Sequence, residues 1–578
     1  MLSVEYELLT FNTENCWTKN SRKTAHKRVP LRLKPCSFFA MIKKTLAKFP
    51  VLTFGLPFEG SLDSSNRWVQ LASSFPWEAI ETAYNSNMCA DNGRPSLPAR
   101  LVLGALIIKH YLNISDAETI LQIQENPYLQ YFVGLEVFQK APIFDPSLFV
   151  AIRTRLGGDG IAAIEKAIAQ SVRSYLDSQV SAKGSTTQPA SDDAPPEQDP
   201  PIADNSANAT SMQDETEQDP TTQTETQVTH RGHLKIDATV APQKIKFPTD
   251  LDLLNAARKK TDNYIDLLCA QLNLPRQNFR TYRRIAYKNY LNIAKKKKKK
   301  KKELRAGIRR QLGYLKRNLL FVKTLIEQVR SNDPQATLKG WRKKELKEYE
   351  TIQKLYGQQR KMYDTQKNTC EGRIVSISQP DVRPIVRGKQ HVSTEFGAKI
   401  GIATVDGITT IDTFSWEAYN ENQDFETHIN RYKELYGVLP ECVNADRIYL
   451  TQKNRALAKQ LGFRLIGKPL GRPKKEDQTA KAKRIAQVER NQRNIVEGKI
   501  GQTKNRYGLD RIAAKTNETT RVWVTCCIIA TNIARWLKAL SLCPFKIWCY
   551  ARNYLSYYFI FANNTFFNIS KHLKVPAF

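Results

Sequence analysis

Two acidic residues lie where a carboxylate is costly unless it has a partner or a task. Asp237 falls in the middle of the alternating run Leu234–Val240, which predicts a strand, and Asp446 follows the short apolar run Cys442–Ala445. A carboxylate on a central strand costs free energy unless it is paired or binds a cation. The carboxyl end of a strand is where open α/β sheets bind their ligands. Taken alone, Asp237 fits a cap, a turn or a salt bridge better than catalysis.

A third acid, Glu497, lies four residues after Arg493 in a basic stretch, 481–497, that is predicted to be a helix. At this spacing the two side chains share one face of a helix. An arginine at such a place can neutralise a phosphate. The simpler alternative is a solvated ion pair between the two residues.

The order of these residues resembles the DDE transposases of bacterial insertion sequences, in the superfamily of insertion-sequence families four and five. Three stretches carry the resemblance: Lys235–Thr239, Asn444–Tyr449 and Arg493-x3-Glu497-x6-Lys504. The resemblance covers most of 41–180 and 230–540. Arg490 stands where the family commonly has a tyrosine, and Ile448 stands where it usually has a glycine. Neither departure touches the three acids.

The resemblance implies an α/β fold with a ribonuclease H-like catalytic domain, a large helical insertion and a preceding all-α, helix-turn-helix-like domain. It implies catalytic and metal-ligating roles for Asp237, Asp446 and Glu497, with two Mg²⁺ or Mn²⁺ ions as cofactor. Phosphodiester hydrolysis and strand transfer use two cations about 4 Å apart, and hard cations such as Mg²⁺ prefer carboxylate oxygens. Three acids in this order therefore suit the implied chemistry.

Several basic residues are candidates for DNA contacts. The resemblance places Arg493 and Lys504 beside the acids. A separate segment resembles a minor-groove hook, and an ordinary basic loop is the simpler interpretation of it. Its candidate residues are Arg472, Lys474 and Lys475.

The function implied is cleavage of DNA at the ends of an insertion sequence, followed by joining of the 3′ hydroxyls to target DNA. The expected partners are double-stranded DNA and further copies of the chain at synapsis, in the bacterial cytoplasm at the nucleoid. Two alternatives stay open. One is a non-integrating nuclease of the same fold, and the other is a catalytically decayed or domesticated DNA-binding protein.

Composition favours a polyanionic partner. The 578 residues include 89 Lys and Arg against 56 Asp and Glu, a net charge of +33, which is unusual for a metabolic enzyme. The ten cysteines form no C-x-x-C pair, so zinc-ribbon and thioredoxin readings fail. No phosphate-binding G-x-x-x-x-G-K-[ST] loop occurs. The uncharged run 553–570 is shorter than the roughly 20 apolar residues of a membrane span, so no membrane role is expected.

The sequence divides into five parts. Residues 181–230 hold ten acids and one lysine with almost no large apolar side chain, which predicts a disordered linker. Met41 would make an ordinary initiator, so the residues before it are expected to be a non-native or disordered leader. The predicted parts are a leader (1–40), a helical DNA-binding domain (41–180), the acidic linker (181–230), the catalytic domain (231–540) and an aromatic tail (541–578).

Periodicity predicts the elements around these residues. Helical spacing runs through Leu101–Leu112, Ser115 is a plausible N-cap for the next helix, and Asp406-Gly407 predicts a hairpin turn between two strands. Within the predicted insertion, at about 250–390, apolar residues from Leu304 to Val329 recur near the 3.5-residue repeat of a coiled coil. Its expected antiparallel partner begins near Trp341. Three roles are open for this predicted pair of helices: it embraces DNA, it forms a dimer contact, or it is a structural hairpin.

The lysine run 295–302 has two interpretations. It either contacts phosphates without sequence preference or forms a solvated loop between helices.

Overall fold

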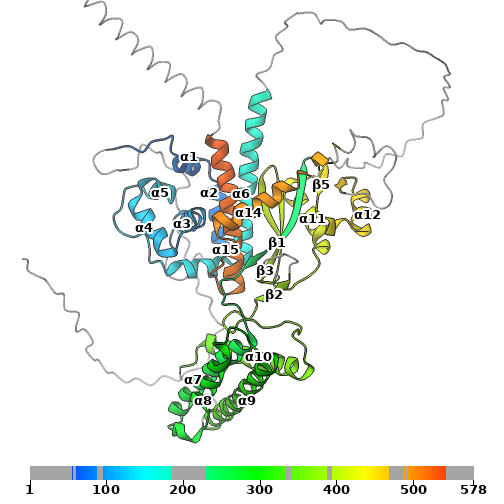
Figure 1. The fold of residues 1–578 in the computed structure, drawn as a ribbon. Coiled ribbons are helices and arrows are strands. Elements are labelled where there is room, and N and C mark those ends of the chain that lie inside the picture. Colours follow the sequence, from blue (N-terminus) through cyan, green and yellow to red (C-terminus); the bar gives the residue numbers. More distant parts are fainter. Residues whose placement is uncertain are drawn as a thin grey trace, which may run out of the picture.

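The computed structural model describes residues 55, 60–86, 96–184, 230–332, 338, 340–386, 394–467, 484, 487–489 and 491–541. The fold is mixed α/β, with a central sheet, a group of amino-terminal helices beside it and a helical lobe that projects from it (Figure 1). The predicted leader, most of the acidic linker, the loop with Arg472, Lys474 and Lys475, and the tail from 542 lie outside the described residues. None of the described helices combines the length and apolarity needed to cross a membrane.

The amino-terminal helices follow the predicted pattern. They are α1 (Arg67–Ser74), α2 (Trp77–Asn85), α3 (Ala99–Leu112), α4 (Asp116–Glu125), α5 (Pro127–Phe132) and α6 (Leu148–Gly184). The hydroxyl of Ser115 accepts a hydrogen bond from the backbone N–H of Glu118 at 3.1 Å, so the predicted N-cap is confirmed. Helix α6 is kinked at Gly157, whose φ of 60° falls in the left-handed region that glycine tolerates.

The apolar core of these helices also contains the last described helix of the chain, α15 (Asn517–Ser541). Trp536 of α15 is buried and stacks on Phe75 with 5.9 Å between ring centroids. Figure 1 shows α15 beside α6, and the two helices pack along each other. Residues from both ends of the described chain therefore share one core.

The sheet is built around the strand that carries Asp237. Its strands are β1 (His233–Pro242), β2 (Arg383–Val386), β3 (Thr394–Val405), β4 (Ile408–Ser415), β5 (Cys442–Asn444) and β6 (Arg464–Ile466). Their order is β2-β3-β1-β5-β6, with β4 also paired to β3. β1 runs antiparallel to β3 and parallel to β5. Asp406 and Gly407 both have positive φ, so the predicted hairpin between β3 and β4 is confirmed.

Short helices link the later strands or pack against the sheet after the last of them. They are η4 (Glu421–Asp424), α11 (Phe425–Tyr436), η5 (Arg447–Tyr449), α12 (Gln452–Gln460) and α14 (Asn494–Tyr507). The expected helix over 481–497 is wrong at its end, because a turn at Gln492 and Arg493 separates the helical residues 487–489 and 491 from α14. Val496 is fully buried in the apolar cluster that contains Ile400 and Ile402, so tertiary packing fixes where α14 begins.

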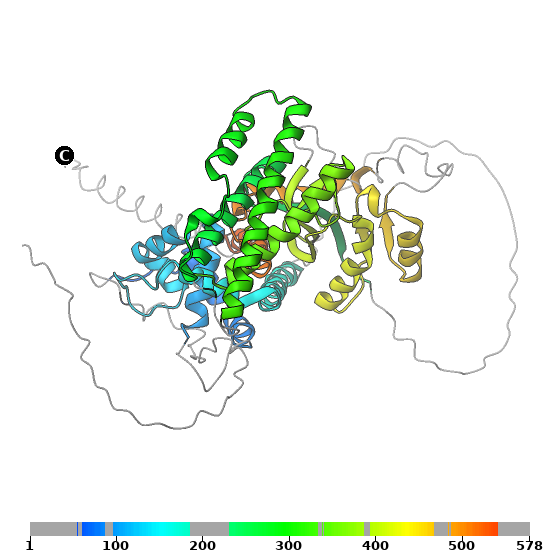
Figure 2. The same cartoon turned by 90° about the horizontal axis from the view of Figure 1, so that it is seen from below.

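The predicted helical insertion is present as a lobe of four helices (Figures 1 and 2), here called the insertion lobe: α7 (Asp250–Gln271), α8 (Arg283–Ala294), α9 (Lys301–Asn332) and α10 (Lys343–Thr365), with the short η3 (Arg276–Asn278). Of the apolar repeat positions in α9, Leu312, Leu315, Val322 and Val329 are buried, and the other four are half-buried. Helix α9 packs against α7 and α8 as well as α10, so the expected two-helix hairpin is part of a larger bundle. Residues 295–300 form the exposed loop between α8 and α9.

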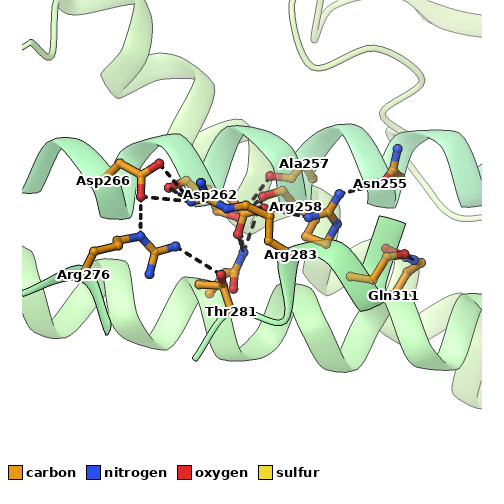
Figure 3. A network of polar contacts seen from close by, with 12 residues as sticks. Asn255, Ala257, Arg258, Asp262, Asp266, Arg276, Thr281, Arg283 and Gln311 are labelled. Atoms are coloured by element: carbon orange, nitrogen blue, oxygen red, sulfur yellow. Dashed lines mark hydrogen bonds and ion pairs between the residues drawn. The ribbon is translucent and has the colours of Figure 1, made fainter. Parts of the chain in front are cut away.

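A polar network lies inside this lobe (Figure 3). The Arg258 guanidinium donates to Asp262 at 2.6 Å and to the Asn255 side chain at 3.0 Å, and the Asn318 amide donates to Asp262 at 2.8 Å. Asp266, one turn further along α7, pairs with Arg276 and Arg283. Burial raises the pKa of Asp262 even though Arg258 opposes that change. The network holds α7, α8 and α9 in one arrangement.

Candidate active site

Strand pairing brings the first two acids together where the short β5 ends beside the middle of β1, a place here called the sheet edge. In the parallel pair of β1 and β5, Lys235 lies opposite Asn444. Asp237 lies two residues after Lys235, and Asp446 lies two residues after Asn444. The two acids are therefore at corresponding positions on neighbouring segments of the chain. Paired strands lie roughly 4.8 Å apart. The two carboxylates are therefore neighbours because of register, although 208 residues separate them in the chain.

Asp237 is held in a low-polarity position. Its carboxylate accepts a hydrogen bond from the backbone N–H of Ala238 at 2.8 Å. Burial raises the pKa of Asp237 to about 6; that hydrogen bond and the Arg493 charge oppose the rise, and the carboxylates of Glu421 and Asp446 add to it. The side chain therefore lies where negative charges gather and where a positive charge would be stabilised.

Arg493 connects the second acid to the third. Its guanidinium lies 3.3 Å from Asp446 and forms an ion pair with Glu497. Arg493 is the N-cap of α14 and Glu497 is in the first turn, so the predicted sharing of one face holds despite the different helix boundary. All three side chains remain partly exposed. The ion pair named above as the simpler alternative does form, and Arg493 also reaches the sheet edge.

The donor atoms of this site suit a hard divalent cation, but the acids are not gathered around a common point. Among the described residues, no group of three acidic, histidine or cysteine side chains lies close enough to hold a metal ion. Arg493 takes up the space between Asp446 and Glu497. Carboxylate oxygens are the ligands that Mg²⁺ prefers. Coordination by all three acids therefore requires Arg493 to release two of them.

A hollow of about 250 Å³ opens beside Asp446 and Arg493. Its wall includes Asn444, Arg447 and Ile466. The Asn444 side chain donates to the backbone carbonyl of Glu489 at 2.7 Å, which ties β5 to the segment that precedes α14.

A fourth acid that the sequence argument missed lies near Asp237. Glu421, at the start of η4, pairs with Lys399 of β3 at 3.0 Å, and its charge contributes to the raised pKa of Asp237. Lys399 is also fixed by a hydrogen bond to the backbone carbonyl of Tyr419 at 2.7 Å. In the sequence, Glu421 is only an acidic residue at the start of a helical segment that follows the predicted hairpin. Acidic residues are common at helix starts, so this pattern alone does not identify Glu421 as part of a site.

Lys504, a predicted DNA contact, and two histidines that lie close to Asp237 in the sequence have other placements. Lys504 lies in the last turn of α14, seven residues after Glu497 and so on a similar face. His230 contacts the backbone carbonyl of Leu461 at 2.8 Å, and His233 lies 3.9 Å from Glu441. These two histidines lie before and at the first residue of β1, and their partners are structural. Arg472, Lys474 and Lys475 lie outside the described residues.

Two family matches cover separate parts of the chain. Residues 57–155 match a family described as a transposase domain (DUF772), and residues 443–534 match one described as a transposase DDE domain. The second match includes Asp446, Arg493 and Glu497, and Asp237 lies outside both.

One relative and no solved structure accompany these matches. An uncharacterized protein, ORF8 in the nfe locus of Rhizobium meliloti, is 35% identical over 99 residues, which are 17% of this chain and 47% of that protein. The chain thus spans less than half of the length of this relative. No solved structure matches the chain.

Proposed function

Because the two family matches support a DDE transposase of insertion sequences, we propose that this chain cuts DNA at the ends of such an element and joins the 3′ hydroxyls to target DNA. One observation carries the proposal: Arg493 links Asp446 and Glu497 at the sheet edge where Asp237 also lies. The family matches do not favour a decayed or domesticated protein.

Each residue of the site has a proposed role. Asp237, Asp446 and Glu497 would hold two Mg²⁺ or Mn²⁺ ions, which when bound activate the attacking oxygen and stabilise the leaving one. Arg493 would exchange its carboxylate partners for a DNA phosphate, because a guanidinium binds either group with the same paired N–H donors. Lys504, on a similar face of α14, would contact the same DNA strand. Since Asp237 is the most buried of the acids, it would fix the position of the site.

The proposal extends to the rest of the molecule. The sheet, with the acid-bearing β1 at its centre, supports a ribonuclease H-like catalytic domain within 231–540. We assign the helices within 41–180 to DNA binding, and double-stranded DNA and further copies of the chain at synapsis as partners. A bacterial cytoplasmic location at the nucleoid follows from that activity.

The test is nicking of a supercoiled plasmid that carries the flanking repeats of the element. The full chain would be compared with its Asp446→Ala variant in Mg²⁺ and in EDTA. Asp159→Ala, a change at an exposed acid of α6, is the matched control. We expect nicking by the wild type and the control in Mg²⁺ alone, and a loss of about 10³-fold or more in Asp446→Ala.

The products separate the remaining possibilities. Joined DNA products identify a transposase, whereas nicks without joining identify a nuclease. Nicking that persists in EDTA, or in Asp446→Ala, would contradict the assigned site. If the wild type and both variants bind DNA but none of them cuts it, the chain would instead be a DNA-binding protein without catalytic activity.

A further inference from the structure

Helix α9 carries a regular series of exposed basic residues on one face. They recur every seven residues, and seven residues are close to two helical turns. The series, here called the basic stripe, consists of Lys302, Arg309, Lys316, Lys323 and Arg330. Twenty-eight residues of helix extend about 42 Å, at 1.5 Å for each residue. The basic stripe is therefore a long, nearly straight line of positive charge.

The basic stripe faces away from the core of the insertion lobe. The apolar side chains of α9, such as Leu315 and Val322, are buried against the other helices, whereas every member of the stripe is exposed. Lys323 lies 3.9 Å from Glu327, which is the one ion pair recorded along the stripe within the described residues. A helix face that is merely solvated usually alternates the sign of its charges. On this face five basic side chains are exposed beside one exposed acid, Glu327, so positive charge predominates.

The lysine loop continues the stripe at its amino-terminal end. Residues 295–300 are all lysine and all exposed, and they lead directly into Lys302. Exposed Arg284 and Lys288 of α8 precede them. Residues 280–330 contain nineteen basic and two acidic side chains, so this one segment carries a charge of +17 out of the +33 of the whole chain. Charge is thus concentrated in this part of the insertion lobe.

A glycine on the same face adds an independent observation. Gly313 lies within one turn of both Arg309 and Lys316, and a side chain built there would meet no atom within 4 Å. A glycine inside a helix costs stability relative to alanine. Gly307 has a packing reason, because a Cβ there would collide with Ile293. Gly313, like Gly357 of α10, has no such contact, and it leaves the helix backbone beside the stripe open to close approach from outside.

We propose that the basic stripe, together with the lysine loop 295–300, is a docking surface for the phosphate backbone of double-stranded DNA. Duplex DNA carries one negative charge per roughly 1.7 Å of its axis, so a line of about 42 Å faces a dense row of charge. Contacts to phosphates position a protein on DNA without reading its sequence. The identification of the polyanion as DNA rests on the proposed function. The location of the binding surface is inferred from the charge and exposure of the side chains alone.

The test measures affinity for a short duplex of unrelated sequence across a range of salt concentrations. It uses the full chain in EDTA, so that no cutting is needed. The stripe variant is Arg309→Gln/Lys316→Gln/Lys323→Gln. The matched control is Lys433→Gln/Lys453→Gln/Lys459→Gln, three exposed lysines on α11 and α12. Thermal melting checks that each variant is folded.

We expect the stripe variant to flatten the plot of log affinity against log salt by about 2.7, which is 0.9 for each lost phosphate contact. The control should keep the wild-type slope. Gly313→Gln adds bulk without charge, and we expect it to weaken binding about 10-fold without lowering the melting temperature.

Three results would overturn the proposal. One is a stripe variant with the wild-type slope, and another is a control that loses as much as the stripe variant. The third is stronger competition by duplex RNA than by duplex DNA of equal length. Because binding is measured in EDTA, a failure of nicking would leave this proposal intact, and a failure here would leave the metal-dependent site intact.

Discussion

The insertion lobe and the sheet edge each contain an arginine with an acid four residues later, and the two pairs differ in burial. Arg258 and Asp262 are 1% and 4% exposed inside the lobe. Arg493 and Glu497 are 26% and 48% exposed, and Asp446, the second partner of Arg493, is 42% exposed. The same spacing therefore produces an internal support in one region and an accessible site in the other.

The two arginine–acid pairs differ in the groups that take the place of water around them. Inside the lobe, Asn255 and Asn318 supply hydrogen bonds that solvent would otherwise make, and the Nε of Arg258 still has no hydrogen-bond partner among the described residues. Breaking such a pair leaves a buried charge, which is very costly. At the sheet edge solvent can take the place of either partner, and an exposed ion pair contributes little. Arg493 can therefore change partners at small cost, and Arg258 cannot.

The largest expected effect comes from removing one acid at each place. We expect Asp262→Ala to destabilise the insertion lobe by about 3 to 5 kcal/mol, because Arg258 loses its buried partner. Asp446→Ala should lower the free energy of unfolding by about 1 kcal/mol at most, because it removes an exposed ion pair and the N-cap of the short η5. Hydrogen exchange of the α7 and α9 amides, together with thermal unfolding, measures both. Equal losses in the two variants would erase the contrast between the regions.

Neutralising the exposed arginine tests function rather than stability. We expect Arg493→Gln to reduce Mg²⁺-dependent nicking by about 100-fold, as removal of one charge-stabilising donor usually does, with unchanged melting. Arg493→Lys should recover part of the activity, because it keeps the charge but loses the paired donors. The readout is the initial rate of plasmid nicking. A nicking rate as fast as the wild type in Arg493→Gln would mean that this arginine is only a surface ion pair.

A buried carboxyl held by a backbone hydrogen bond sharpens the comparison further. Glu165 of α6 accepts a hydrogen bond from the backbone N–H of Ile411 at 3.0 Å, and burial raises its pKa to about 8 from an ordinary value of 4.5. The folded state therefore holds a proton that the unfolded state has released, so stability falls as pH rises between those values. We expect Glu165→Gln to remove a slope of up to about 1.4 kcal/mol per pH unit in this window.

Unfolding by denaturant at several pH values between 4.5 and 8 measures that slope. Glu426→Gln, a change at an exposed acid of α11, is the control and should keep the slope of the wild type. Parallel pH profiles for the wild type and Glu165→Gln would show that this carboxyl is ionised in the folded protein.

The smallest expected effect concerns helix starts in the two regions. The Thr249 hydroxyl accepts a hydrogen bond from the backbone N–H of Asp252 at the beginning of α7, as Ser115 does for α4. Thr249→Ala and Ser115→Ala should each cost about 1 kcal/mol. Hydrogen exchange should show faster exchange in the insertion lobe for the first variant and in the amino-terminal helices for the second. Uniform changes across the chain would mean that the regions unfold together.

Local pattern was enough to predict much of this fold. Alternation predicted β1, helical spacing predicted α3, and Asp406-Gly407 predicted the hairpin between β3 and β4. Each of these signals arises within a few residues of chain. The heptad repeat predicted a long helix in the insertion for the same reason, although it did not predict that α7 would be its main support.

Long-range pairing decided the rest. The register that places Asp237 beside Asp446 depends on hydrogen bonds between distant strands, and no local pattern encodes it. The contact of Arg493 with Asp446 depends on where α14 begins, which the burial of Val496 fixes. Whether an arginine and an acid at this spacing are internal or exposed likewise depends on the elements that cover them.

The core shared by α6 and α15 determines whether the protein can be produced as two separate fragments. Phe75 and Trp536 meet in that core, and residues 185–229 connect the elements on its two sides. A polypeptide severed between 185 and 229 keeps every residue of the shared core. Two co-expressed fragments are therefore expected to assemble and copurify as one folded body. Either fragment made alone would expose an apolar surface that its counterpart normally covers.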